Sequence, residues 1–222
     1  MDSVEVTALV ATRQALHAVA DWVLAPLRHA RDGHIGLRVT PGGFGHDLAR
    51  VEGSDLLVGD GRAALTTLAA AAAFAGVEPG RHSGVYEPVT RWAPDALLPV
   101  DSGASVRLAG WFAHGQVLLD ELCAAAPPGD EAPAAITLWP EHLDLATTVG
   151  RAGHRVNVGF SAGDDRTPLP YLYVGPWNPV DRDTAGGATY WNEPYGASLA
   201  YEAALDRTRA LAFVERGLAL AP

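Results

Sequence analysis

The stretch Arg155-Val156-Asn157-Val158-Gly159-Phe160-Ser161 decides the predicted fold, because apolar residues alternate with polar or small ones along it. Val156, Val158 and Phe160 would face a core, and the residues between them would line the opposite surface. Such alternation is typical of a strand with one buried face. Antiparallel sheets commonly keep the other face polar, so the stretch predicts a strand of an antiparallel sheet.

Two flanking segments share this period and extend the strand into a sheet. Ile136 to Val149 precedes it as one long strand, and Tyr171 to Val174 follows it. We expect the three strands to form an antiparallel meander. A final helix over about Ser198 to Leu218 would close the chain.

The N-terminal part combines helical and strand patterns. A helix is predicted from about Val6 to Arg28, and Pro26 should kink or end it near Leu24. The strand and hairpin that follow are predicted over Ile35 to Thr40 and over Val51 to Val58, with the hairpin turning at Gly53-Ser54. Further helices are predicted from about Thr66 to Ala75 and from about Asp101 to Cys123, with a proline- and glycine-rich loop or lid at 77–100 between them.

Together these elements predict an α+β fold. It would hold a mostly antiparallel sheet, made of the hairpin and the C-terminal meander, covered by three or four helices. We interpret residues 1–222 as a single domain, with 127–131 as the best candidate for an internal linker.

Composition narrows the classes of function. The net charge of −10 argues against a binder of nucleic acid or of anionic membranes, since either would need a basic surface. All 16 basic residues are arginine, which excludes a lysine Schiff base and a P-loop. Cys123 is the only cysteine, so no intramolecular disulfide can form. The acidic N-terminus and the shortness of the longest apolar run, Leu68 to Ala75, predict a cytoplasmic protein.

The segment Trp139-Pro140-Glu141-His142-Leu143-Asp144-Leu145-Ala146 is the richest in reactive side chains. On one continuous strand, His142 and Asp144 would share a face, with Leu143 and Leu145 on the core side. A turn near residues 151–152 would bring His142 opposite Ser161 and Asp144 opposite Gly159. The pair could orient an imidazole as a general base or supply two metal ligands, and an ordinary exposed polar face is the alternative.

Aromatic and amide side chains would surround this pair. Tyrosine and tryptophan suit a small-molecule pocket because they combine an apolar ring with a polar tip, although they also suit packing of the sheet against the last helix. The residues predicted to bind a ligand are Trp139, Asn157, Ser161, Tyr171, Tyr173 and Trp177.

Three segments of the chain also resemble a known family of proteins. Trp139 to Ala146, Asn157 to Asp164 and Pro170 to Trp177 together resemble a family of uncharacterised bacterial proteins with a Trp-Pro-Glu-His-Phe-Asp-type motif. Ile35 to Gly45 looks like that family's Gly-Leu-Arg-x-Thr-Pro-Gly-Gly-Phe-Gly stretch, and Leu143 stands where the family motif has phenylalanine. Because no activity is established for the family, the resemblance supports treating the chain as one unit and implies no mechanism.

Three functions follow as hypotheses. The first is a small-molecule-binding protein, which could also be an enzyme with His142 as general base and Asp144 as its orienter. The second is a metal-dependent hydrolase that uses His142 and Asp144 as ligands, joined by Glu141 or Asp164. The third is a non-enzymatic protein whose aromatic surface binds a partner or a second copy of the chain. The sequence leaves the ligand and any cofactor open.

Overall fold

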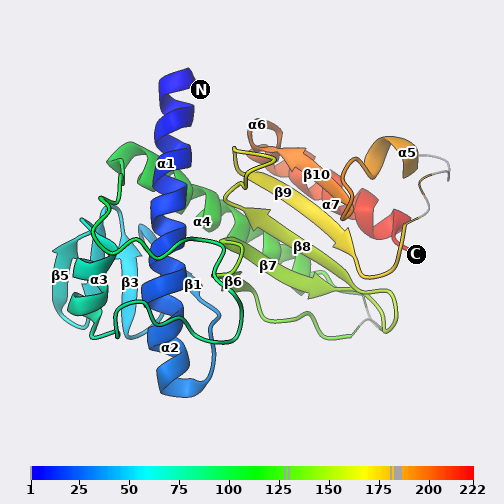
Figure 1. The fold of residues 1–222 in the computed structure, drawn as a ribbon. Helices are drawn as coiled ribbons and strands as arrows, with labels where there is room; N and C mark the ends of the chain where they lie inside the picture. Colours follow the sequence, from blue (N-terminus) through cyan, green and yellow to red (C-terminus); the bar gives the residue numbers. More distant parts are fainter. Residues whose placement is uncertain (1, 128, 130, 181, 183–186) are drawn as a thin grey trace. The chain divides into compact units, whose positions relative to one another are not determined.

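A computed structural model describes residues 2–127, 129, 131–180, 182 and 187–222 (Figure 1). Contacts between residues divide the chain into two compact units, which are described one at a time. The first comprises residues 1–113 and 137–144, and the second comprises 114–136 and 145–222. Parts of the predicted linker at 127–131 lie outside the described residues, and the prediction of a single domain stays a prediction.

A long N-terminal helix with a wide turn in its middle is the main helix of the first unit. It runs through α1 (Ser3–Val19), the π-helical segment η1 (Ala20–Leu24) and α2 (Ala25–Asp32) (Figure 1). Asp2 begins it with a capping box, and Gly33 ends it in the left-handed conformation. Pro26 was predicted to kink or end the helix near Leu24, and of these alternatives the end is wrong, because α2 continues to Asp32. The π turn precedes Pro26, which lies in the first turn of α2, where proline is tolerated, and the helix runs on.

A five-stranded antiparallel sheet forms the rest of the first unit's framework. Its strands lie in sequence order: β1 (Arg38–Thr40), β2 (Gly43–Gly45), β3 (Ala49–Glu52), β4 (Asp55–Val58) and β5 (Gly61–Ala64). The predicted hairpin is confirmed as β3 and β4, with Gly53 at a φ of 62° in its turn. The sequence missed β2, whose two glycines let β3 approach closely. A β-carbon on Gly43 would come within 2.1 Å of the Val51 carbonyl oxygen.

Two helices and a long loop complete this unit. Helix α3 (Leu68–Ala75) begins at its cap Thr67 and ends at Gly76, and α4 (Ser102–Ala124) contributes its first half. The predicted loop between them is confirmed, because residues 77–100 contain neither helix nor strand beyond one isolated bridge at Leu97.

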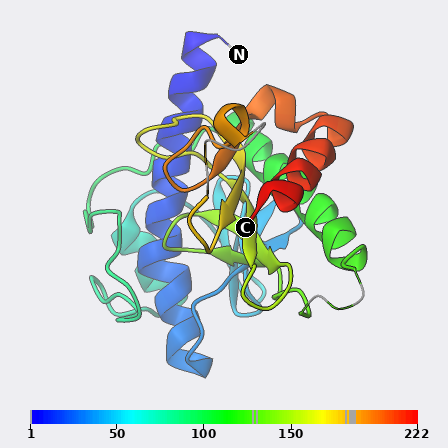
Figure 2. The same ribbon diagram turned by 90° about the vertical axis from the view of Figure 1, so that its right-hand side faces the viewer.

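The second unit is built on the predicted meander. The structure orders its sheet β10-β9-β8-β7-β6, where β6 (Thr137–Trp139) belongs to the first unit by its contacts. The other strands are β7 (Asp144–Val149), β8 (Val156–Ser161), β9 (Tyr171–Pro176) and β10 (Ala197–Ala200). The α+β class with antiparallel sheets is confirmed (Figures 1 and 2).

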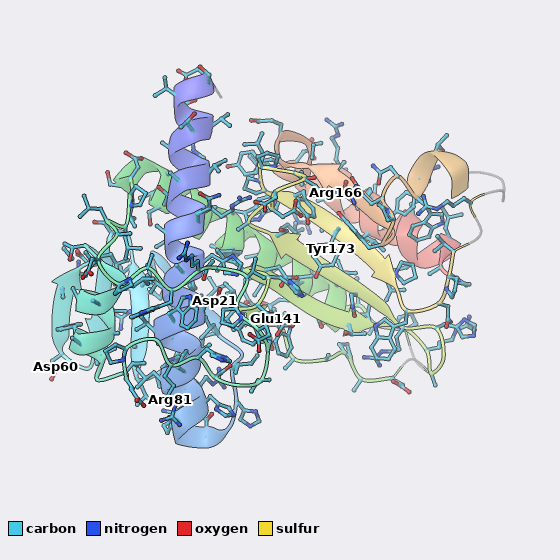
Figure 3. All side chains as sticks on the ribbon, in the orientation of Figure 1. Asp21, Asp60, Arg81, Glu141, Arg166 and Tyr173 are labelled. Atoms are coloured by element: carbon cyan, nitrogen blue, oxygen red, sulfur yellow. The ribbon has the colours of Figure 1, made fainter. Side chains whose placement is uncertain are left out.

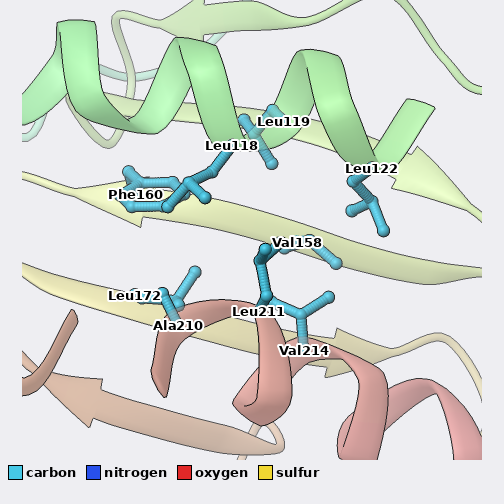
Figure 4. A pocket seen from close by; sticks show the side chains of 9 residues that line it. All are labelled: Leu118, Leu119, Leu122, Val158, Phe160, Leu172, Ala210, Leu211 and Val214. Atoms are coloured by element: carbon cyan, nitrogen blue, oxygen red, sulfur yellow. The ribbon is translucent and has the colours of Figure 1, made fainter. Parts of the chain in front are cut away.

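Helices cover one face of this second sheet. The second half of α4 and the last helix, α7 (Arg207–Leu220), pack against alternate residues of β8 and β9 (Figure 4). The apolar layer leaves a void of about 10 Å³, room for roughly one water molecule. It is lined by Leu118, Leu119, Leu122, Val158, Phe160, Leu172, Ala210, Leu211 and Val214.

The predicted helix over Ser198 to Leu218 is wrong in its first part. Residues 197–200 pair with β9 as β10, and a short helix, α6 (Tyr201–Ala204), follows. Asp206 then starts α7 by accepting a hydrogen bond from the Arg209 amide at 3.1 Å. Another short helix, α5 (Gly187–Tyr190), precedes β10. Across the described residues, no helix is long and apolar enough to cross a membrane.

Candidate functional site

The segment Trp139 to Ala146 forms a turn between two strands. β6 ends at Trp139, residues 140–143 turn, and β7 begins at Asp144. The prediction of one strand from Ile136 to Val149 is therefore wrong. Pro140 cannot donate to a strand ladder, and Leu143 adopts a φ of 48°, a left-handed conformation that a leucine rarely takes. Backbone strain of this kind concentrates at functional sites.

The turn separates the two predicted catalytic residues. The His142 side chain is 70 % exposed, and its Nε2 lies 3.8 Å from Glu141 Oε1. Asp144 is buried, with 5 % of its surface exposed. The prediction that His142 and Asp144 share one face of a strand is thus wrong, whereas Leu143 and Leu145 are buried as expected. The predicted positions of His142 opposite Ser161 and of Asp144 opposite Gly159 stay predictions.

The turn instead approaches a histidine of the long N-terminal helix. The carbonyl of Pro140 accepts a hydrogen bond from the His17 ring, whose side chain is 14 % exposed. Burial, the largest cause, lowers the pKa of His17, and the charges of Arg13 and His142 lower it further. Asp21 opposes this shift, with its Oδ2 at 3.8 Å from His17 Nε2.

Asp21 is a buried carboxylate that anchors the loop at 77–100. Its Oδ1 accepts a hydrogen bond from the Tyr86 hydroxyl at 2.7 Å. Its Oδ2 accepts two from Thr90, from the hydroxyl at 2.6 Å and from the amide at 3.1 Å. Burial, together with the charge of Asp21, raises the pKa of Tyr86 far above its ordinary value. The charge of Glu141 raises the pKa of Tyr86 further. Figure 3 labels both Asp21 and Glu141.

Asp21 and its neighbour Trp22 both contact this loop. Asp21 and Trp22 lie within η1, and the Trp22 indole donates to the carbonyl and the hydroxyl of Thr90, each at 3.1 Å. The Trp22 ring also lies 5.5 Å from Trp92. Single π turns are often found at functional sites.

No pattern in the sequence predicted that His17, Asp21, Tyr86 and Thr90 would come together. A histidine and an aspartate four positions apart on a mostly apolar helix face are a usable signal, because such side chains are neighbours on a helix. Tyr86 has no such signal, since it lies 65 positions from its partner Asp21.

The predicted polar face of the second sheet is partly assembled. Strand register pairs Ser161 with Tyr171 and Gly159 with Tyr173, and it pairs Asn157 with Gly175. Ser161 and Tyr171 are buried and serve the structure. Ser161 Oγ accepts from the Gly163 amide at 3.1 Å, and the Tyr171 hydroxyl donates to Asp164 Oδ2 at 2.7 Å. Burial and this bond raise the pKa of Tyr171.

The other end of the face is more open. Trp177 is 64 % exposed, and its indole donates to Asn157 Oδ1 at 2.9 Å. The same oxygen accepts from Thr148 Oγ1 at 2.8 Å. Gly175 leaves the backbone bare beside this amide, and a β-carbon there would meet nothing nearer than the Tyr195 carbonyl oxygen at 3.5 Å. We call Asn157, Tyr173, Gly175 and Trp177 the ring platform. Trp139, the remaining predicted ligand residue, is 38 % exposed and belongs to the first unit.

The described residues contain no group of three or more His, Cys, Asp or Glu side chains arranged to hold a metal ion. The metal-dependent alternative therefore finds no ligand set within that part of the chain. Comparison of the chain with protein-family models, with curated proteins and with solved structures gave no match. The resemblance to a bacterial family accordingly stays a prediction.

Proposed function

We propose that this protein binds a small molecule with a flat, uncharged ring and a carbonyl group, and that the ring platform is its binding site. The observation that carries this proposal is the Asn157 side chain. The Trp177 indole can only donate, so the amide atom that it meets must be the oxygen. With that oxygen accepting two hydrogen bonds, the amide nitrogen is left with two donors that have no partner among the described residues.

The surroundings of that amide favour a flat ligand. Gly175, directly opposite Asn157, offers backbone without a side chain, and Trp177 lies exposed two positions further on. Tyr173 lies two positions before Gly175 on the same face. Aromatic rings pair by offset stacking or edge-to-face contact, so a flat ring over Gly175 could contact Tyr173 or Trp177. An acceptor on that ring would take the free amide protons of Asn157.

The protein's charge favours an uncharged ligand over an anion. The chain carries a net charge of −10, and two arginines of the second unit are already paired with carboxylates, Arg155 with Glu131 and Arg166 with Glu193. We therefore choose benzamide as the probe, since it joins a flat ring to a neutral carbonyl. Cyclohexanecarboxamide keeps the amide and loses the flat ring, so it serves as the matched control compound.

Calorimetric titration tests the proposal with two variants. Asn157→Asp keeps an oxygen for Trp177 and Thr148 and removes the amide donors, so it should weaken benzamide binding about tenfold or more. Gly175→Ala adds a methyl group at an ordinary contact distance of 3.5 Å and should block the ring. Gly110→Ala, where a β-carbon meets nothing within 4 Å, is the control substitution. Equal affinities of all four proteins for benzamide, or equal affinity for cyclohexanecarboxamide, would refute the proposal.

A further inference from the structure

Strand β5 is an open edge of the first sheet. It ends the strand order, and among the described residues its four residues, Gly61 to Ala64, pair as a strand with β4 alone. The Leu65 amide donates to the Ser54 carbonyl at 2.9 Å, on the side of β4. Since strand residues alternate, the N–H and C=O groups of Arg62 and Ala64 point away from β4, toward the open edge. Such an edge is a template for another strand.

Helix α3 lies beside this edge and is apolar on every side (Figure 1). Its sequence, Leu-Ala-Ala-Ala-Ala-Ala-Phe-Ala, holds no polar side chain, yet Ala70, Ala73 and Phe74 are exposed. The Phe74 ring borders β5, because a β-carbon on Gly61 would lie 3.1 Å from it. A helix that is hydrophobic all round is normally covered, so this exposed stripe and the β5 edge together indicate an interface.

We propose that two copies of the chain join at this edge, with β5 antiparallel to β5 of the second copy, about a two-fold axis perpendicular to the sheet. Such an axis keeps each face of the sheet on its own side. The two α3 helices therefore lie on the same face of one continuous sheet, and their exposed apolar stripes flank the axis. The edge and the helix belong to the first unit, so this pairing is independent of ring binding in the second.

One register satisfies the open edge. It places Ala63 opposite its own copy and Arg62 opposite Ala64 of the second copy, so the outward-pointing backbone groups bond to each other. A register with Arg62 opposite itself would set two like charges side by side, which is unfavourable. A shift in the other direction needs the carbonyl of Thr66, which already accepts from the Leu98 amide at 2.8 Å.

The charges on the outer face of the sheet favour a second copy as the partner. The ladder aligns Arg38, Arg50 and Arg62 in one cross-strand row, and Glu52 and Asp55 in the next. Within one copy Arg62 donates to both carboxylates. In the joined sheet the acidic row of each copy continues into the arginine row of the other, with one alanine between them. The two edges are therefore complementary in charge, although the chain as a whole carries −10.

Sedimentation velocity tests the pairing. Between about 1 and 200 μM the unsubstituted protein should pass from the monomer mass to twice that mass. Ala64→Pro removes an N–H that points to the open edge and leaves the bonds to β4, so it should stay monomeric. Ala73→Glu should also stay monomeric, since it places a charge in the apolar stripe of α3. Ala113→Glu, at an exposed alanine of α4, is the control and should pair like the unsubstituted protein.

A cross-link tests the register. Where opposite residues of an antiparallel pair do not bond to each other, their α-carbons lie about 4.5 Å apart, within the range of a disulfide. Ala63→Cys in a Cys123→Ser background should therefore give a disulfide-linked dimer under mild oxidation, and Ala113→Cys in that background should not.

Three results would each overturn the proposal. The first is an unsubstituted protein that is monomeric at every concentration. The second is pairing that survives in the folded Ala64→Pro and Ala73→Glu variants. The third is a dimer that Ala63→Cys does not cross-link.

Discussion

Thr90 donates two hydrogen bonds to one oxygen of Asp21, from its hydroxyl at 2.6 Å and from its amide at 3.1 Å. A single residue of the loop at 77–100 thus supplies both donors to one oxygen of a buried carboxylate. That carboxylate belongs to the N-terminal helix, 69 positions away in the sequence. Because a buried charge without partners is costly, this contact ties the loop to the helix.

Removing one of these two donors should loosen the loop. Thr90→Val keeps the amide bond and the shape but loses the hydroxyl, which also accepts from the Trp22 indole. Bonds to charged groups contribute about 1.5–3 kcal/mol each, so we expect the free energy of unfolding to fall by about 2 kcal/mol. Urea denaturation measures this, with Thr66→Val as a control that should change stability by less than about 0.5 kcal/mol. Equal losses in both variants would show that the hydroxyl bond contributes nothing specific.

Stability should fall in mild acid because of His46. Its Nδ1 accepts from the Leu48 amide at 3.2 Å, so Nε2 carries the proton that bonds the Leu24 carbonyl at 3.0 Å. Burial lowers the pKa of His46 below its ordinary value of 6.5, so the unfolded chain binds more protons in the interval between the two values. The free energy of unfolding therefore rises with pH in that interval. The stabilisation that comes from keeping His46 neutral is lost as the pH falls below about 6.5.

His46→Gln removes this titration and is the variant to compare. Part of the acid loss should remain in it, because the pKa of His17 is lowered for the same reason. Thermal unfolding between pH 5 and pH 8 measures both proteins. A variant whose melting temperature shows the same pH dependence as the unsubstituted protein would exclude His46 as a source of acid lability.

Two glycines that face the same side of the second sheet should differ in their tolerance of alanine. At Gly159 a β-carbon would lie 2.5 Å from the Tyr173 ring, which also contacts Tyr171 and Tyr195. At Gly175 the nearest atom would be 3.5 Å away. We expect Gly159→Ala to cost about 1–3 kcal/mol, as overpacking does, and Gly175→Ala to change stability little. Chemical denaturation of both variants decides this, and similar costs would mean that Tyr173 moves aside freely.

The apolar layer between α4, α7 and the second sheet should account for much of that unit's stability. Leu119 is 1 % exposed and lines the small void there, so Leu119→Ala should cost about 2–5 kcal/mol. Val117→Ala on the same helix changes a side chain that is 55 % exposed and should cost less than about 0.5 kcal/mol. A small effect of both substitutions on the urea midpoint would contradict the packing described for this layer.

Sequence patterns predicted the strands in which buried and exposed residues alternate regularly. β8, β9 and the β3–β4 hairpin follow from strict alternation and from turn glycines. The turn at 140–143 was missed because the alternation of His142, Leu143 and Asp144 fits a strand, and nothing in a leucine signals a positive φ. β10 was missed because it has only four residues, which is too short for a strand alternation to be recognised, and these residues run directly into the helical pattern of the last helix.

The candidate sites were predictable to different degrees. Asn157, Tyr173 and Trp177 could be placed on one surface because strand parity is a local property. The environment of His17 could not, because it depends on Tyr86, Thr90 and Pro140, which only the folded chain brings together.

The most direct test of ring binding at the platform is a ¹H–¹⁵N spectrum recorded during titration with benzamide. We expect the indole N–H of Trp177 and the amides of Gly175 and Asn157 to shift together and to saturate, while the indole of the buried Trp111 stays unchanged. Shifts confined to other residues, or no saturable shift at Trp177, would contradict the proposed site.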